Sequence, residues 1–194
     1  HLGNYAAKAF DLSYDYIINS NEKVAEKGHK TEEAINTIDE KLTRYLISLS
    51  GEALSQKESE VLTNILDSSR DLERIGDHAE ALINLNDYLQ RKNVQFSEAA
   101  LEELAEIYHK TSEFVKDALE SVENNDFKKA QALIERHENI NNMERILRKT
   151  HIKRLNNGEC STQAGVNFID IISHYTRVSD HAMNLAEKVL AEQI

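Results

Sequence analysis

The chain has 194 residues, of which 40% are hydrophobic and 29% are charged, with 6 glycines and no proline. This composition is typical of a soluble, helix-rich protein with one domain or two small halves sharing a core, and it argues against turn-rich β folds. The net charge of −11 disfavours binding to nucleic-acid phosphates, and no apolar run is long enough to span a bilayer.

Helical periodicity divides the chain into six predicted helices, over residues 4–27, 31–50, 56–92, 98–123, 126–156 and 162–192. Gly28, Gly51 and Gly158 each follow a helical pattern, so we predict that they form C-terminal caps. At the opposite ends, Ser55 opens a capping box with Glu58. The sequence also predicts N-caps at two further serines, Ser97 and Ser161.

One phrase of the predicted third helix recurs in the sixth. Residues 70–82 read RDLERIGDHAEAL and residues 174–185 read HYTRVSDHAMNL, so Arg-x-x-Asp-His-Ala occurs once in each half. Such self-similarity indicates a duplicated unit, and the spacing of apolar residues in the third helix is that of a bundle seam. The sequence therefore predicts an all-α, elongated bundle of six helices. It consists of two pseudo-symmetric three-helix repeats, residues 1–96 and 97–194.

A stripe of acidic residues lies within this third helix. Glu73 and Asp77 are four residues apart and therefore share a helix face, which Glu80 continues. Like charges at this spacing repel one another unless a cation or a basic partner lies between them. Gly76, inside the same helix, costs about 1 kcal/mol relative to Ala, which suggests close approach of another backbone or room for a ligand.

Two interpretations of this stripe remain open from the residues alone. The carboxylates are either solvated or paired with Arg74 and Arg177 between helices, or they are oxygen ligands for a divalent or iron cation in a helical bundle. His78 and His181 follow their aspartates by one residue and so point about 100° away from them. Packing or capping is the expected role of these two histidines.

Enzymatic patterns are weak. A ferritin-like di-iron enzyme needs two Glu-x-x-His pairs and two further glutamates on four helices. Glu106 and His109 supply one pair, and Glu26 and His29 supply another that straddles the predicted end of the first helix. A metal-dependent helical-bundle enzyme therefore remains a distant alternative.

Nucleophilic chemistry has no better support. Cys160 is the single cysteine and lies in a polar loop, with His151 upstream but no third group to orient the pair. There is no glycine-rich phosphate loop and no Gly-x-Ser-x-Gly elbow. We predict that the protein is not an enzyme.

The repeated phrase also resembles a known family signature. LERIGDHA in residues 72–79, with its weaker copy TRVSDHA in 176–182, resembles the signature of the PhoU family. The later stretch HENINNMERILRKTHIKRLNNGECS, which continues into GVNFIDIISHYTRVSDHAMNLAEKV, resembles the PhoU-like domain at the C-terminus of bacterial sodium/phosphate cotransporters. The most specific part of that match is the segment His151-Ile-x-Arg154-Leu155…Gly158-x-Cys160-Ser161.

This resemblance implies a two-fold repeat of three-helix bundles, non-enzymatic regulation of phosphate uptake or signalling, and frequent dimers. Some family members bind metal clusters through Glu/Asp-x-x-x-Asp motifs. Carried over by position, the implied ligands of a divalent or iron cation are Glu32, Glu73, Asp77 and Asp180. The positions that depart from the family motif are Asn36, His137, Asn141 and Thr176. Neutral Asn is a weaker ligand than a carboxylate for hard cations, so we expect fewer metals than in relatives, especially in the second half.

Together, these features predict a PhoU-like cytoplasmic regulatory domain of a sodium-dependent phosphate cotransporter, whose membrane part precedes His1. It would act at the cytoplasmic face of the membrane by binding rather than catalysis. The expected partners are the membrane transporter portion or transporter complex and a second copy of the chain, with no nucleic acid and no direct membrane insertion. The alternative is a free-standing, cytoplasmic PhoU-type regulator of phosphate signalling.

Overall fold

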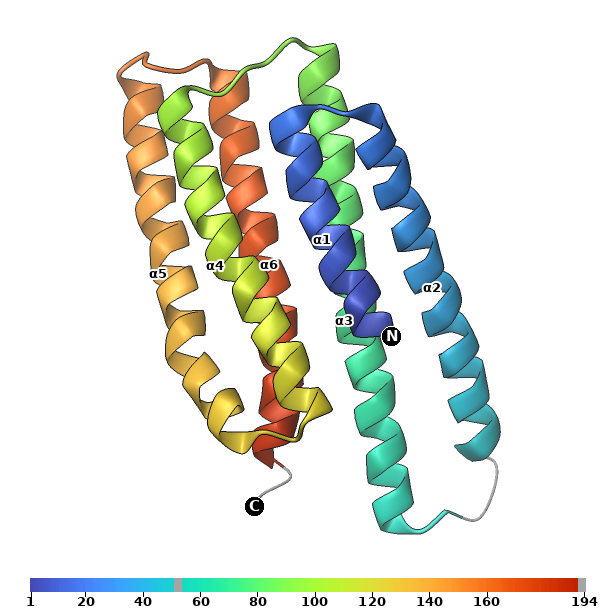
Figure 1. The fold of residues 1–194 in the computed structure, drawn as a ribbon. Coiled ribbons are helices and arrows are strands. Elements are labelled where there is room, and N and C mark those ends of the chain that lie inside the picture. Colours follow the sequence, from blue (N-terminus) through green and yellow to red (C-terminus); the bar gives the residue numbers. More distant parts are fainter. Residues whose placement is uncertain (51–53, 192–194) are drawn as a thin grey trace.

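The computed structural model describes residues 1–50 and 54–191. These residues form six helices and no strand, which confirms the predicted all-α class (Figure 1). The helices are α1 (Leu2–Asn19), α2 (Glu22–Ser50), α3 (Gln56–Arg91), α4 (Glu98–Glu123), α5 (Phe127–Asn156) and α6 (Thr162–Ala191). None of the described helices is both long enough and apolar enough to cross a bilayer.

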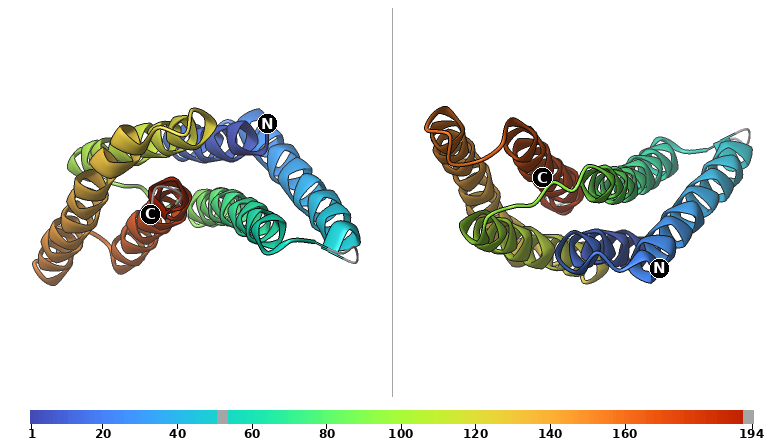
Figure 2. Two further views of the ribbon diagram at one scale, coloured as in Figure 1. Left: turned by 90° about the horizontal axis from the view of Figure 1, so that it is seen from below. Right: turned by 90° about the horizontal axis from the view of Figure 1, so that it is seen from above.

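The helices form two three-helix units that lie side by side in an elongated bundle. In the first unit α1 packs against α2 and α3, and in the second α4 and α5 pack against each other and against α6. The units meet where α3 packs on α6 and α1 packs on α4. Views along the bundle show α3 and α6 next to each other at the centre, with α2 and α5 at opposite ends (Figure 2). The two helices that carry the repeated phrase are therefore in contact.

The main apolar core runs through both units, and a smaller cluster of Tyr16, Ala25 and Ile83 lies in the first. Phe10 and Ile75 from the first unit, and Phe168 and Tyr175 from the second, are each fully buried within the main core. Burial of each such Ile or Phe side chain stabilises the fold by about 1.5–3 kcal/mol. The division into repeats at residues 96 and 97 stays a prediction, although it falls in the connection between α3 and α4.

The predicted serine caps are present. Ser55 accepts a hydrogen bond from the backbone N–H of Glu58 at 3.3 Å, and the Glu58 carboxylate accepts one from the Ser55 N–H at 2.8 Å. Ser97 and Ser161 each accept from the N–H three residues later, at 3.3 and 3.1 Å. Gly158 lies just beyond α5 with φ of +71°, a backbone conformation that favours glycine. These four predictions are confirmed.

The predicted boundary between the first two helices is wrong. The sequence predicted a first helix over residues 4–27 that is capped by Gly28, but α1 ends at Asn19. Ser20 adopts the left-handed conformation there, with φ of 51°. The second helix begins at Glu22 and continues through Gly28.

Gly28 is explained by packing instead of capping. A Cβ atom at this position would lie 2.3 Å from Cδ1 of Ile83 on α3, so a glycine allows α2 and α3 to approach closely. The predicted cap at Gly51 and the predicted last residue of the sixth helix, at 192, lie outside the described residues.

Candidate functional site

The packing of α2 on α3 brings four carboxylates into one region, which we call the acidic cluster: Glu32, Glu73, Asp77 and Glu80. Three of them come from α3, where spacings of four and three place them on one face. Gly76 supports this arrangement because a Cβ there would lie 2.9 Å from Cδ1 of Ile35 on α2. The glycine predicted to permit close approach of another helix does so in the structure.

Burial and mutual repulsion raise the pKa of three members of the cluster. Glu32 is only 7% exposed, and burial, followed by the charges of Glu80 and Asp77, raises its pKa. The pKa of Glu73 is raised by burial and then by Asp77. Burial also raises the pKa of Asp77, with Arg74 opposing and Glu80 adding to the shift. Negative charge is therefore disfavoured here unless a cation compensates it.

The only guanidinium that contacts the cluster within the described residues satisfies it in part. Arg74 Nη1 lies 3.3 Å from Asp77 Oδ2, and Arg74 Nε lies 3.7 Å from Glu73 Oε2. That second distance is too long for a hydrogen bond, and Glu73 Oε2 is buried without a hydrogen-bond partner among the described residues. A buried carboxylate oxygen without a hydrogen bond is costly, so Oε2 of Glu73 can still accept one.

Two further residues of α2 contact carboxylates of the acidic cluster. The Asn36 side-chain amide donates a hydrogen bond to Glu32 Oε1. His29 Nδ1 lies 3.2 Å from Glu80 Oε1. Sequence reasoning did not identify the second contact, because its partners are 51 residues apart and only the packing of two helices brings them together.

The donors suit a hard cation, but they are not yet arranged around one. Carboxylate oxygens are the ligands that Mg²⁺, Ca²⁺ and Mn²⁺ prefer. In residues 1–50 and 54–191, no group of three His, Cys, Asp or Glu side chains is placed to hold a metal ion. Metal binding at Glu32, Glu73 and Asp77 therefore requires these side chains to converge, and it stays a prediction.

Asp180 lies in a different environment, against α5. His137 Nε2 is 2.9 Å from Asp180 Oδ1, and Arg177 Nη1 is 3.4 Å from Asp180 Oδ2. Thr176, at the position that Glu73 holds in the first unit, donates its hydroxyl to the Ile172 carbonyl at 3.0 Å. Both oxygens of Asp180 thus have partners from the chain, and they are poorly placed to bind an added cation.

Histidines line the seam between α3 and α6. His78 Nδ1 and His174 Nδ1 are 3.0 Å apart, and His181 Nδ1 lies 3.0 Å from Asp71 Oδ1. Burial, followed by the nearby His174 and His181, lowers the pKa of His78 to about 4. The packing role predicted for His78 and His181 agrees with these contacts, whereas the sequence gave no signal for His174.

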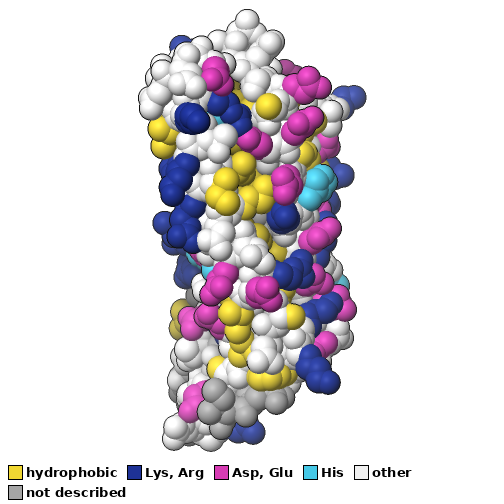
Figure 3. Space-filling view, turned by 90° about the vertical axis from the view of Figure 1, so that its left-hand side faces the viewer, with side chains coloured by type: hydrophobic (Ala, Val, Ile, Leu, Met, Phe, Trp, Pro, Cys, Tyr) yellow, Lys and Arg dark blue, Asp and Glu magenta, His cyan; other side chains and the backbone are white. Residues whose placement is uncertain are grey.

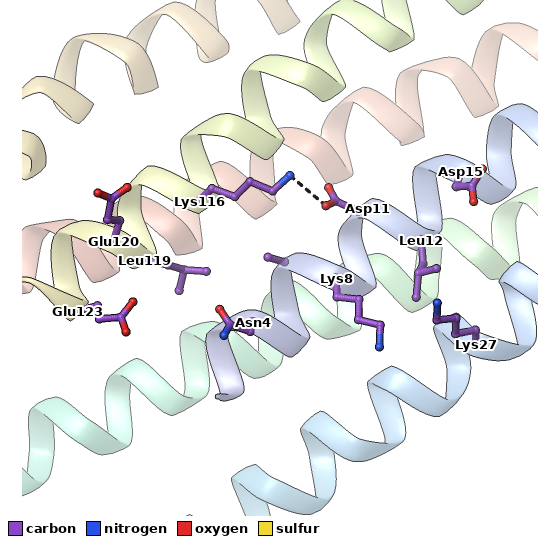
Figure 4. A pocket seen from close by; sticks show the side chains of 11 residues that line it. Asn4, Lys8, Asp11, Leu12, Asp15, Lys27, Lys116, Leu119, Glu120 and Glu123 are labelled. Carbon is purple, nitrogen blue, oxygen red and sulfur yellow. Dashed lines mark ion pairs between the residues drawn. The ribbon is translucent and has the colours of Figure 1, made fainter.

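A groove of about 700 Å³ lies between α1, α2 and α4, and none of the four carboxylates of the acidic cluster lines it (Figure 4). Its charged lining is Lys8, Asp11, Asp15, Lys27, Lys116, Glu120 and Glu123. Lys116 Nζ pairs with Asp11 Oδ2 at 3.0 Å. Because the carboxylates outnumber the lysines, the groove does not favour a free phosphate anion.

The glutamates of the di-iron alternative make separate surface contacts. Glu26 pairs with Lys30 on α2 at 2.5 Å, and Glu106 pairs with Lys110 on α4 at 3.4 Å. Both glutamates are exposed, and each pairs with a lysine on its own helix. The described residues thus offer no assembled carboxylate–histidine site of the ferritin type.

Known proteins are similar to this chain in both units of the fold. A family model described as the PhoU domain matches residues 1–85 and 104–189. The phosphate-specific transport system accessory protein PhoU homolog 1 of Thermotoga maritima is 29% identical over 178 residues. That match covers 92% of this chain and 68% of the relative.

Solved structures show the same fold. The crystal structure of PhoU from Pseudomonas aeruginosa has a TM-score of 0.89 at 18% identity, and the match covers 100% of this chain and 93% of that one. The phosphate transport system regulatory protein PhoU from Streptococcus pneumoniae has a TM-score of 0.85 at 21% identity, covering 99% and 89%. At these identities the similarity concerns the arrangement of the helices.

Proposed function

Because this chain belongs to the PhoU family, we propose that it regulates phosphate uptake by binding to a phosphate transport system. The observation that carries this proposal is the match of the PhoU domain model to both halves of the chain. The relative from Thermotoga maritima is described as an accessory protein of phosphate-specific transport, which supports phosphate transport as the regulated process. We propose that the protein acts by conformational bias and does not turn over a substrate.

The descriptions of the relatives favour a PhoU-type regulator over a domain of a sodium/phosphate cotransporter. They name an accessory protein and a regulatory protein of phosphate transport systems, and neither names a sodium-dependent carrier. In the proposed role the chain works in the cytoplasm or at the cytoplasmic face of the membrane, against a transporter component. A homodimer is the proposed assembly.

The acidic cluster is the proposed cation site of this regulator. The buried Oε2 of Glu73, which has no hydrogen bond among the described residues, and the raised pKa values of Glu32 and Asp77 support it. A divalent or iron cation would neutralise the repulsion between these carboxylates and draw α2 and α3 together. Asp180 is not expected to contribute, because His137 and Arg177 already occupy its oxygens.

Long exposed helix faces provide the surface for a protein partner. On the face viewed in Figure 3, acidic, basic and apolar side chains are intermixed instead of forming one basic field. A mixed surface of this kind suits a protein partner better than a nucleic acid. The same face therefore supports regulation through protein contact.

The test is control of phosphate flux in cells. We expect deletion of this protein to change how uptake responds to external phosphate while a transport pathway remains, and expression of the intact chain to restore the response. Phosphate uptake is measured at low and high phosphate together with the abundance of the transporter. Complete loss of flux at normal transporter abundance argues against a purely regulatory role, and an unchanged response in every phosphate regime argues against any role in control.

The sodium dependence of the controlled flux separates the two forms of the proposal. For a PhoU-type regulator of a phosphate-specific transport system, we expect the flux that changes on deletion to persist when sodium is replaced by potassium. If only sodium-dependent uptake responds to the deletion, the cotransporter-domain form is favoured.

A further inference from the structure

The α2–α3 hairpin extends beyond the start of α1. We call residues 40–50 and 54–66 the hairpin end, which comprises the last part of α2 and the first part of α3. α1 has 18 residues, whereas α2 has 29 and α3 has 36. Figure 1 shows the two longer helices continuing past the N-terminus of the chain. A helix face with no further layer packed on it leaves its apolar side chains uncovered.

The apolar side chains of the hairpin end join neither apolar cluster of the protein. None of them belongs to the main core or to the smaller cluster in the first unit. Four are exposed: Tyr45 by 61%, Ile47 by 59%, Val61 by 51% and Ile65 by 41%. Apolar side chains that gather on an exposed surface are typical of a protein interaction site.

Two grooves flank the exposed apolar residues of α3. Val61 and Ile65 line a groove of about 410 Å³ towards α2, where Leu46 is on the other wall. They also line a groove of about 450 Å³ towards the second unit, which contributes Val122. Tyr45 lines neither groove. The hairpin end thus offers both projecting apolar side chains and hollows that can receive them.

The charge of the hairpin end differs from that of the whole chain. It has three basic and three acidic residues, Lys41, Arg44, Lys57, Glu40, Glu58 and Glu60. These charges cancel, whereas the chain as a whole carries −11. A large net charge opposes contact between two copies of a protein, and a contact made at the hairpin end is the least opposed.

The two helices of the hairpin end also carry opposite net charges. The part on α2 has two bases and one acid, and the part on α3 has one base and two acids. In a two-fold arrangement the same surface is used by both copies. If α2 of one copy faces α3 of the other, a net charge of +1 meets one of −1 twice. The hairpin end is therefore complementary to itself in charge and in shape.

We propose that a second copy of this chain docks on the hairpin end, so that two α2–α3 pairs form a four-helix bundle around a two-fold axis. Such a bundle buries the inward faces of all four helices. The proposal rests on the homodimer of the proposed function and assigns its interface. A strongly acidic or basic partner is disfavoured, because the hairpin end has no net charge to attract it.

The molar mass of the purified chain in solution is the first test. We expect light scattering across a dilution series to show a species of about twice the 22.1 kDa of one chain. Ile65→Lys should raise the Kd of this dimer at least about a hundredfold, because a two-fold interface loses the isoleucine from both copies. Ile65 is already exposed, so the fold of one chain should tolerate the lysine.

A matched control separates the interface from a general effect of added charge. Ile146 on α5 is 63% exposed and lies outside the hairpin end. Ile146→Lys adds the same charge to the same residue type, and it should leave the Kd of the dimer unchanged. Circular dichroism checks the fold of both variants.

Hydrogen exchange of the unsubstituted chain gives a test that needs no variant. We expect the amides of residues 40–50 and 54–66 to exchange more slowly at high protein concentration than at low concentration. The amides of α5 should exchange equally at both. This measurement decides the matter even if Ile65→Lys does not fold.

Three results would overturn the proposal. The first is a purified chain that is monomeric at every concentration. The second is a folded Ile65→Lys variant that dimerises as tightly as the unsubstituted chain, and the third is concentration-dependent protection confined to other helices. If a monomeric chain controls phosphate flux and Ile65→Lys alone abolishes that control, the hairpin end binds a transport component instead of a second copy. Deletion of the protein tests flux control separately, so regulation can stand where this interface fails.

Discussion

The third helix of each unit carries an aspartate at the equivalent position, but the two aspartates have different neighbours. Asp77 on α3 and Asp180 on α6 each pair with an arginine three residues earlier, at 3.3 and 3.4 Å. Across from Asp77, α2 supplies the carboxylate of Glu32, whose pKa is raised by burial and then by the charges of Glu80 and Asp77. Across from Asp180, α5 supplies His137, whose Nε2 is 2.9 Å away.

This difference shows that a repeated fold does not imply a repeated function. In the second unit, His137 and Arg177 contact the two oxygens of the aspartate, and the hydroxyl of Thr176 donates to a backbone carbonyl of its own helix. In the first unit, Glu73 occupies the position of that threonine, and its buried Oε2 has no hydrogen bond among the described residues. We therefore expect an added cation to stabilise the first unit more than the second.

Cation titration gives the largest expected effect of this asymmetry. We expect Mn²⁺ or Mg²⁺ to raise the free energy of unfolding by about 2.7 kcal/mol at a concentration one hundred times its Kd. Glu73→Ala removes a ligand and should abolish most of that gain. Asp180→Asn should keep it, because His137 and Arg177 already contact the two oxygens of Asp180. Thermal unfolding with and without the cation measures both variants.

Elemental analysis of the purified proteins is the independent check on this prediction. The unsubstituted chain and Asp180→Asn should retain equal metal, and Glu73→Ala should retain less. Equal metal content in the unsubstituted chain and Glu73→Ala would remove Glu73 from the ligand set. Loss of metal only in Asp180→Asn would reverse the proposed asymmetry.

Exchanging the opposing residues between the units gives the next largest effect. Without metal, Glu32→His should stabilise the first unit, because it replaces like-charge repulsion with an imidazole facing Asp77. The reciprocal His137→Glu should destabilise the second unit, because Asp180 loses its partner and gains a like charge. Each change is expected to be between a few tenths and about 1 kcal/mol. Urea unfolding at pH 7 measures it, and shifts of the same sign in both variants would contradict the comparison.

Local chemistry made much of the fold predictable. The serine caps depend on contacts within four residues, so Ser55, Ser97 and Ser161 were identified correctly from the sequence. The repeated Asp-His-Ala phrase predicted that α3 and α6 are equivalent. Gly28 was misassigned because its role depends on Ile83, which is distant in sequence but would lie 2.3 Å from an added Cβ. A glycine that permits helix contact and one that ends a helix follow the same local pattern.

The candidate site was less predictable for the same reason. Helical spacing placed Glu73 and Asp77 on one face, but only the resemblance to a family suggested that Glu32 faces them from another helix. The contact between His78 and His174 depends on how α3 crosses α6, and residue spacing does not encode that crossing. Intrahelical neighbours could be read from the sequence, whereas interhelical partners needed the structure.

The smallest expected effect is a pH dependence of opposite sign in the two units. Burial and like charges raise the folded-state pKa of Glu32 above its ordinary value of 4.5. Burial alone would raise the pKa of Asp117 on α4, but hydrogen bonds from Arg136 and Lys129 outweigh it and lower that pKa below 3.8. Glu32 therefore binds more protons in the folded state, whereas Asp117 binds more in the unfolded state.

Linkage between protonation and folding fixes the direction of each effect. Glu32 lowers the free energy of unfolding as pH rises through the window just above 4.5. At pH 7 the free energy of unfolding of Glu32→Gln should therefore equal that of the unsubstituted chain or exceed it by a few tenths of a kcal/mol. This advantage should disappear near pH 4. Asp117 stabilises above 3.8 and loses its contribution as pH falls through its lowered pKa. Asp117→Asn should then be less stable at pH 7, by a few tenths of a kcal/mol, and this deficit should shrink below pH 3.8. Urea unfolding across this range measures both differences. If Glu32→Gln were destabilising at pH 7, Glu32 would be a satisfied structural acceptor, and the proposal that the first unit binds a cation while the second does not would lose its electrostatic basis.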